Sequence, residues 1–286
     1  MVGDDKSSNQ LVGTVLILLL MLVVGSVSFY LGTHWTSSRQ GGGSSGVLSG
    51  GGTEEGQAMV HPGLSGDAQY DGVQSLDLSV ANGTVDCEED DLPAGEVRLS
   101  WRYESKARRD IDEGDVELKA QLADGVLHIE DWRNKQAGKL GNINIHLELK
   151  HGPGVEWLDA SHGNGTFCYD GSAARCISLG NGTLALEGQP AGDAKVSVGN
   201  GTLEADWLVA QGQHQLSVGN GTIDLGLREG SSLAVDASTG IGGISAPAGI
   251  NVRRTGLLGA TAHGSINGTA AGIDLSVGNG SVDIRQ

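Results

Sequence analysis

The chain has 286 residues, of which 48 are glycine, and a formal net charge of −17. Glycine weakens helix interiors and suits closely spaced turns, and there are only 2 Phe and 4 Tyr, so the composition disfavours an ordinary helical or α/β core. A field this acidic repels phosphate backbones and anionic bilayer surfaces. The charge therefore argues against nucleic-acid binding and against lying flat on lipid, and its simplest explanation is solubility.

Residues 11–32 form an apolar segment, and no Asp, Glu, Lys or Arg occurs between Lys6 and Arg39. At the helical rise this segment spans roughly 33 Å, enough to cross a bilayer core. We therefore predict a short tail over residues 1–10 and a transmembrane helix over residues 11–32, through which the protein contacts the membrane. A cleaved signal peptide is the competing interpretation, but the first ten residues are not basic and the apolar stretch is long. The few flanking charges leave the orientation undecided.

Residues 33–66 contain GGGSSGVLSGGG and no periodic apolar pattern, which predicts a flexible Gly/Ser-rich linker. Within it, residues 42–46 match a nucleophile-elbow pattern, but they lack the strand-turn-helix context that this chemistry requires. The remainder, residues 67–286, is expected to be the folded domain.

One phrase recurs in this domain: an alternating half-strand, an Asn-Gly pair, Thr or Ser, and a second half-strand. Its copies are LSVANGTVDC from Leu78, ISLGNGTLAL from Ile177, VSVGNGTLEA from Val196, LSVGNGTIDL from Leu216 and LSVGNGSVDI from Leu275, with weaker copies from Ala160 and His263. The asparagines from Asn164 to Asn220 are spaced 17, 19 and 20 residues apart, and Thr239 continues the period. Such a period predicts a solenoid with one coil per repeat, and the alternation predicts strands with one buried face.

The Asn-Gly pair is expected to form a tight corner between the two half-strands. Stacked coils would then place Asn181, Asn200 and Asn220 above one another, so that their amides hydrogen-bond as a ladder.

Before the regular repeat, apolar residues alternate from Val97 to Tyr103 and from Ile143 to Leu149, and Asp124-Gly125 predicts a hairpin turn. We expect residues 67–159 to form an irregular β cap and residues 160–286 to form regular coils. The predicted fold class is all-β: a single-stranded parallel β-solenoid (β-helix) with coils of about 20 residues behind an N-terminal transmembrane helix.

In these phrases, and in the closing GSINGTAAGIDLSVGNGSVDI, the sequence resembles the bacterial putative-adhesin families, over roughly Leu76 to Gln286. The resemblance implies a β-solenoid built from repeats that end in Asn-Gly or Ser-Gly turns. It also implies an envelope-associated, non-enzymatic domain carried behind a single membrane helix, outside the cytoplasm.

Seven Asn-Gly-Thr/Ser sequons are possible glycosylation sites. The favoured interpretation is structural: a corner that needs Asn-Gly, followed by a strand that prefers Thr, produces the same three residues. The sequons lie at Asn82, Asn164, Asn181, Asn200, Asn220, Asn267 and Asn279.

Acidic residues recur at the outward position four after the asparagine, which would make Glu204 and Asp224 neighbours. Calcium at this pair, or at residues 88–91, is one interpretation; solvated acidic faces are the favoured one, because calcium needs six or more converging oxygens. The eight histidines show no metal-binding spacing and are expected on the surface.

The alternation places Cys87 inward as a small core residue. It places Cys168 and Cys176 outward, flanking a turn, where a disulfide would be allowed in an oxidising compartment.

No residues stand out as catalytic, cofactor-binding or metal-binding, and no cofactor is expected. The sequence favours a non-enzymatic, single-pass membrane protein whose C-terminal domain lies in the periplasm or outside the cell, acting as an adhesin or binding module for an envelope or surface ligand. The alternatives are a self-associating envelope scaffold, whose closing strand from Ser276 would be an unpaired edge, and an accessory protein that senses envelope stress.

Overall fold

The computed structural model describes residues 59–61, 64–105, 111–112, 114–134 and 143–286. The predicted N-terminal tail, the transmembrane helix over 11–32 and most of the linker lie outside these residues. No helix of membrane-spanning length and hydropathy occurs in the described part of the chain.

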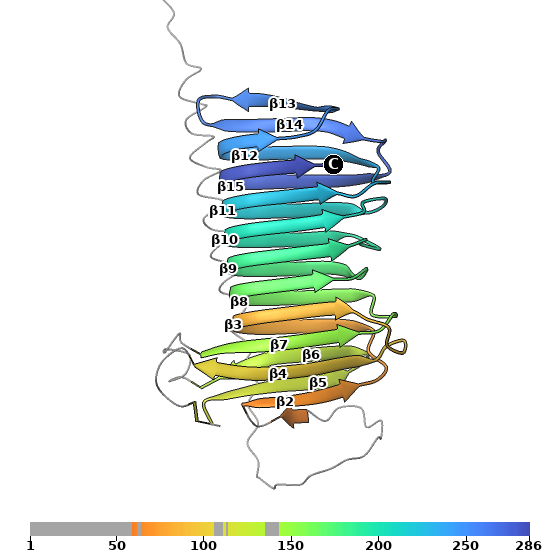
Figure 1. Cartoon of the computed structure of the whole chain (residues 1–286), viewed down its shortest axis with the longest axis vertical. Helices are drawn as coiled ribbons and strands as arrows, with labels where there is room; N and C mark the ends of the chain where they lie inside the picture. The colour runs from red at the N-terminus through yellow and green to blue at the C-terminus, as the bar shows by residue number, and fades with distance from the viewer. Residues whose placement is uncertain (1–58, 62–63, 106–110, 113, 135–142) are drawn as a thin grey trace, which may run out of the picture. The chain divides into compact units, whose positions relative to one another are not determined.

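The described residues form an all-β structure with a long, mostly parallel sheet, as the sequence predicts (Figure 1). The strands are β1 (Met59–His61), β2 (Ser65–Tyr70), β3 (Ser75–Glu89), β4 (Val97–Ser105), β5 (Val116–Ala123), β6 (Val126–Arg133), β7 (Ile143–His151), β8 (Trp157–Asp170), β9 (Ala174–Gly188), β10 (Ala194–Trp207), β11 (Gln213–Leu227), β12 (Leu233–Ser245), β13 (Ile250–Thr255), β14 (Gly259–Ile266) and β15 (Ala271–Arg285).

The centre of the structure is a stack of long strands, β8 to β11, in which each strand pairs in parallel with the next. Each strand bends at its Gly-Asn-Gly corner, so its two halves lie in two layers, one behind the other (Figure 1). Burial alternates along both halves, and the inward side chains of both layers belong to one apolar core. The predicted alternation is thus confirmed, and the arrangement is consistent with a β-solenoid.

Glycine is obligatory at the corner. Gly201 has a φ of +140°, and a Cβ atom there would lie 1.8 Å from the carbonyl oxygen of Gly182 in the coil below. The same close approach recurs at Gly182 and Gly221. Only a residue without a side chain allows the coils to stack at this distance.

The spatial order of the coils differs from their order in the sequence at both ends of the stack. β3 pairs in register with β8, although four strands intervene in the chain, so a regular coil already exists inside the segment expected to be an irregular cap. At the other end, β15 lies between β11 and β12.

Two predictions about this end are therefore wrong. Asn279, rather than Thr239, follows Asn220 in the stack, and Ile241 takes the next position. The closing strand β15 is not an unpaired edge, because it has a strand on each side. Sequence spacing alone cannot reveal such an inserted coil, since every copy of the phrase fits the same register.

The N-terminal end is covered by strands outside the parallel stack. β6 pairs with the first half of β3, over Ser75–Ser79, and β7 pairs with its second half, over Gly83–Glu89. β5 and β6 form the predicted hairpin, with φ values of 50° at Asp124 and 77° at Gly125. β4 pairs with β7, β2 pairs with β4, and β1 pairs with β5, all antiparallel.

The C-terminal end has a second cap, which the repeat pattern does not predict. β12 and β14 pair antiparallel, and so do β14 and β13. The weak copy of the phrase at His263 belongs to this antiparallel cap and not to a coil. Arg253 and Arg254 are exposed on β13, the last strand of the described sheet, and charge of this kind discourages edge-to-edge pairing.

Candidate functional site

The predicted asparagine ladder is present and is longer than expected. Each amide nitrogen Nδ2 donates to the Oδ1 of the asparagine in the preceding coil of the stack, at 2.7 to 2.8 Å. The six rungs are Asn82, Asn164, Asn181, Asn200, Asn220 and Asn279. Because all donors point the same way, the chain of amides is polarised, and its members strengthen one another.

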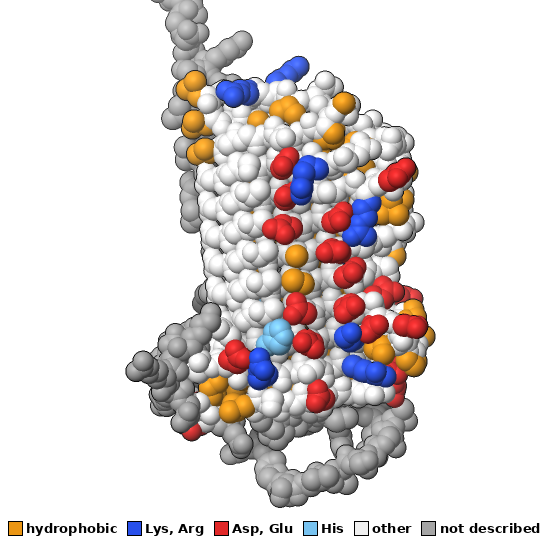
Figure 2. All heavy atoms as spheres, in the orientation of Figure 1, with side chains coloured by type: hydrophobic (Ala, Val, Ile, Leu, Met, Phe, Trp, Pro, Cys, Tyr) orange, Lys and Arg blue, Asp and Glu red, His pale blue; other side chains and the backbone are white. Residues whose placement is uncertain are grey.

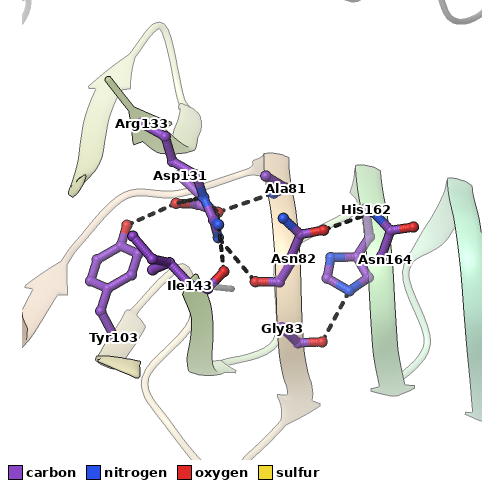
Figure 3. Close-up of polar contacts among 9 residues, drawn as sticks. All are labelled: Ala81, Asn82, Gly83, Tyr103, Asp131, Arg133, Ile143, His162 and Asn164. Carbon is purple, nitrogen blue, oxygen red and sulfur yellow. Dashed lines mark hydrogen bonds and ion pairs between the residues drawn. The ribbon is translucent and has the colours of Figure 1, made fainter. Parts of the chain in front are cut away.

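The ladder ends at Asn82, where a buried ion pair takes over (Figure 3). Residues 80–82 lie between the segment of β3 that pairs with β6 and the segment that pairs with β7. The Asp131 carboxylate accepts the backbone N–H of Ala81 at 3.1 Å, and the Arg133 guanidinium donates to the carbonyl of Asn82 at 3.1 Å. These two side chains supply the partners that a neighbouring strand would otherwise provide.

Asp131 and Arg133 also bond to each other and to neighbouring residues. Arg133 and Asp131 are 2.7 Å apart with side chains only 6% and 0% exposed, and Arg133 also donates to the carbonyl of Ile143. The hydroxyl of Tyr103 donates to Asp131 at 3.0 Å, and burial together with this carboxylate raises the pKa of Tyr103. A buried ion pair held by these hydrogen bonds closes the N-terminal end of the stack and has a structural role.

The layer formed by the second half-strands carries acidic side chains in two columns (Figure 2). The residues of the first column, aligned by the strand register, are Glu148, Asp86, Cys168, Ala185, Glu204, Asp224 and Asp283. Those of the second are Lys150, Glu88, Asp170, Glu187, Asp206, Gly226 and Arg285. We call this surface the acidic face; neighbours within a column lie about 4.8 Å apart, the spacing of strands.

Two open hollows adjoin one another along the two columns, and we call them together the groove. One part, of about 460 Å³, extends across β7, β3 and β8 to Glu187, with Cys168 and Tyr169 in its lining. A second part, of about 340 Å³, shares Ala185 and Glu187 with the first and continues to Arg285. The groove is therefore long, open and bordered by carboxylates, which suits an extended partner better than a small molecule.

Three cations partly neutralise the acidic face. Lys150 lies 2.9 Å from Asp90 and 3.5 Å from Glu88, and its hydrogen bond to Asp90 is the main cause that raises the pKa of Lys150. Arg228 lies 3.2 Å from Asp206 and 3.3 Å from Glu187, and Arg285 pairs with Asp224. Glu204 lies in the first column, between Ala185 of β9 and Asp224 of β11.

The structure places the residues of the two calcium sites considered from the sequence in different arrangements. Glu204 and Asp224 are neighbours, as expected. In the run over residues 88–91, Glu88 and Asp90 instead pair with Lys150. Among the described residues, no group of three or more His, Cys, Asp or Glu side chains is arranged to hold a metal ion.

The three cysteines lie in different environments. Cys87 is buried in register with Leu225 and Ile284, as predicted. Cys168 lies on the acidic face between Asp86 and Ala185, whereas Cys176 lies on the opposite layer between Asp159 and Lys195. The core separates the two thiols, and both are free, so the disulfide allowed by the sequence does not form here. Burial, followed by nearby acids, raises the pKa of Cys168 to about 11.

The prediction that the histidines lie on the surface is wrong for three of them. His151, His162 and His214 are buried, and burial lowers the pKa of each. Their backbone partners are the carbonyls of residues at strand ends and corners; Nε2 of His162, for example, donates to Gly83 at 3.2 Å (Figure 3).

A fully buried arginine was also missed. Arg175 donates to the carbonyls of Gly171 at 2.9 Å and Ala173 at 3.1 Å, and its guanidinium carbon lies 4.5 Å from the Tyr169 ring centroid and 5.5 Å from that of Trp207. Alternation in β9 places Arg175 in the inward phase, so the signal was present in the sequence. The side chain ties down a turn of the coil from within the core.

Comparison with known proteins adds little to this description. No protein-family model and no curated protein matches the sequence. Among solved structures, the chain is similar to a "putative cell adhesion protein" from Clostridium sporogenes, with 14% identity, a TM-score of 0.42, and coverage of 78% of this chain and 99% of that one. A likeness of this size leaves the function of the present chain to be argued from its own residues.

Proposed function

We propose that the protein is a non-enzymatic β-solenoid, anchored by a single membrane helix over residues 11–32, which acts as a binding or adhesion module on the outer side of the cell membrane. The observation that carries the proposal is the acidic face. Its columns repeat along the stack with the spacing of the strands, and two open hollows that share Ala185 and Glu187 adjoin one another along it.

The chemistry of this face favours a cationic, extended partner from the envelope or from another surface. Carboxylates spaced by one strand repel one another, and a partner with regularly placed positive groups relieves that repulsion. Extended repeat surfaces commonly provide binding area without a deep pocket. The buried Asp131–Arg133 pair, by contrast, bonds to the backbone of β3 and supports the fold.

The first test is accessibility of residues 67–286 to added protease in intact cells, with sealed inside-out vesicles as control and permeabilisation of any outer membrane. Digestion in intact or permeabilised cells is expected. Digestion only in inside-out vesicles would place the domain in the cytoplasm and end the adhesion proposal.

The second test compares two matched variants in binding to cationic and to anionic beads. One variant neutralises four acids of the acidic face, Glu187→Gln, Glu204→Gln, Asp206→Asn and Asp224→Asn. The other neutralises four acids of the opposite layer, Asp77→Asn, Asp159→Asn, Asp236→Asn and Asp274→Asn. We expect the first variant to lose most of its binding to cationic beads and the second to retain it; equal losses would mean that net charge alone matters.

Thiol labelling locates the partner independently. A partner in the groove should slow labelling of Cys168 and leave Cys176, on the opposite layer, unchanged.

A further inference from the structure

We infer that Asn267 is a site of spontaneous deamidation, and that the stack protects the asparagines of the ladder from the same reaction. Seven Asn-Gly pairs occur in the chain, six in the ladder and one at Asn267. Asn-Gly is chemically the most susceptible pair, because glycine presents no side chain to hinder attack by its own backbone nitrogen.

The reaction requires that two groups can move: the side-chain amide of the asparagine and the backbone N–H of the following glycine. The backbone nitrogen of the glycine loses its proton and attacks the side-chain carbonyl carbon of the asparagine. A bond forms between these atoms, the bond to Nδ2 breaks, and ammonia leaves. Water then opens the resulting succinimide to aspartate or isoaspartate. The side chain must rotate onto the following peptide, so any contact that fixes either group slows the step.

Both groups are fixed in the ladder. The amide of Asn200 donates to Asn181 and accepts from Asn220, both at 2.8 Å, so rotation breaks two hydrogen bonds. The following residue, Gly201, lies in a strand paired on both sides and approaches the backbone of Gly182 so closely that it has no room to shift. Exposure does not separate the two classes of site, because Asn200 and Asn267 are both exposed.

Neither group is fixed in this way at Asn267. Asn267 lies in the connection between β14 and β15, with φ 52°, and its amide donates one hydrogen bond of 3.1 Å to the carbonyl of Ser231. The nearest obstacle to a Cβ at Gly268 is the hydroxyl of Ser232, a small side chain rather than backbone. The side-chain amide therefore has one hydrogen bond to break. The attacking peptide lies outside any strand and is held by a single side-chain bond, from the Ser232 hydroxyl to the carbonyl of Asn267 at 3.0 Å, instead of by a paired strand on each side.

Deamidation here also has a structural consequence. A carboxylate at residue 267 would face the carbonyl of Ser231 in place of the donor, and Ser231 is fully buried. The new repulsion should loosen the connection that leads the chain from the C-terminal cap back into the stack.

The test is a time course on the full-length chain at mildly alkaline pH, with loss of each amide and formation of isoaspartate quantified by peptide mass spectrometry. Asn82, Asn164, Asn181, Asn200, Asn220 and Asn267 all precede Gly-Thr, so the protein contains its own matched controls. We expect Asn267 to react at least roughly tenfold faster than Asn181 or Asn200, because the ladder sites react only through local opening. In denaturant the rates should converge.

Asn267→Gln should remove the fast phase and leave the slow phases unchanged. The inference is overturned if internal ladder sites in the folded protein react as fast as Asn267. It is also overturned if Asn267 stays intact while the denatured sample is converted.

Discussion

The central coils and the two ends of the stack satisfy the polar groups of a bent strand in different ways. From β8 to β11, each corner amide is bound to the amide one coil away, so one short phrase, repeated, serves every rung. Beyond Asn82 the described residues contain no further rung, and Asp131 and Arg133 bond to the backbone at residues 81 and 82 instead. At the other end Ile241 takes the position that follows Asn279. Repetition thus specifies the middle of the stack, whereas each end requires residues that occur once.

A substitution at a corner glycine is the most severe test of how the central coils stack. Gly201→Ala places a Cβ 1.8 Å from the carbonyl oxygen of Gly182 at a φ of +140°, so we expect a loss of about 4 kcal/mol or more in the free energy of unfolding, measured by denaturant titration. Gly243→Ala, in the second half of β12, is the control, since nothing lies within 4 Å of its Cβ position. Similar losses in both variants would show that close stacking is not what the corner requires.

Removing the Asp131 carboxylate should destabilise the N-terminal end of the stack. Asp131→Ala leaves the Arg133 guanidinium buried without its partner, and we expect a loss of about 3 kcal/mol or more. Hydrogen exchange should accelerate at Ala81 and remain slow at Leu203, because the pair closes one end only. Asp77→Ala, at an exposed position on β3, is the control. Uniform acceleration along the stack would contradict a local role.

The ladder itself should give graded effects. Asn200→Ala removes two hydrogen bonds and should cost about 1 to 2 kcal/mol, whereas Asn279→Ala removes the one it donates to Asn220 and should cost about half as much. Unfolding measurements on both variants check this ratio. Equal costs would mean that the amides act independently of their place in the ladder.

The smallest expected effect is a dependence of stability on pH. Burial lowers the pKa of His151, His162 and His214 below the ordinary value of 6.5, so below that pH the unfolded chain binds protons that the folded chain does not. The stability that neutral histidines provide is present above pH 6.5 and should decline as the pH falls below it. His162→Gln should flatten part of this slope in denaturant titrations at pH 7 and pH 5; an unchanged slope would assign the dependence to other groups.

Much of the central stack, and one hairpin of the N-terminal end, could be predicted because their signals are local. Alternation indicated the strands, the spacing of Asn181, Asn200 and Asn220 indicated the register, and Asp124-Gly125 indicated a hairpin. Each of these features depends on residues close together in the chain or related by a constant period.

What could not be predicted depends on a choice among equivalent partners. Asn220 could stack equally well with the next position in the sequence or with Asn279, and only the complete fold selects Asn279. The pairing of Asp131 with residues 80–82 joins positions fifty residues apart with no repeated signal. The acidic groove likewise emerges only when columns from separate coils are aligned, although its individual acids were visible as a recurring outward position.

The insertion of β15 between β11 and β12 has a consequence for biosynthesis. Strand β12 leaves the ribosome before β15, yet its place in the finished stack is one coil further out. Until β15 has been made, β12 either stays unpaired with the stack or pairs with the open edge of β11. In the second case β15 must later displace it. We therefore expect the coils beyond β11 to reach their final order only once β15 has been synthesised, in contrast to β8 through β11, whose coils can be added in the order in which they are synthesised.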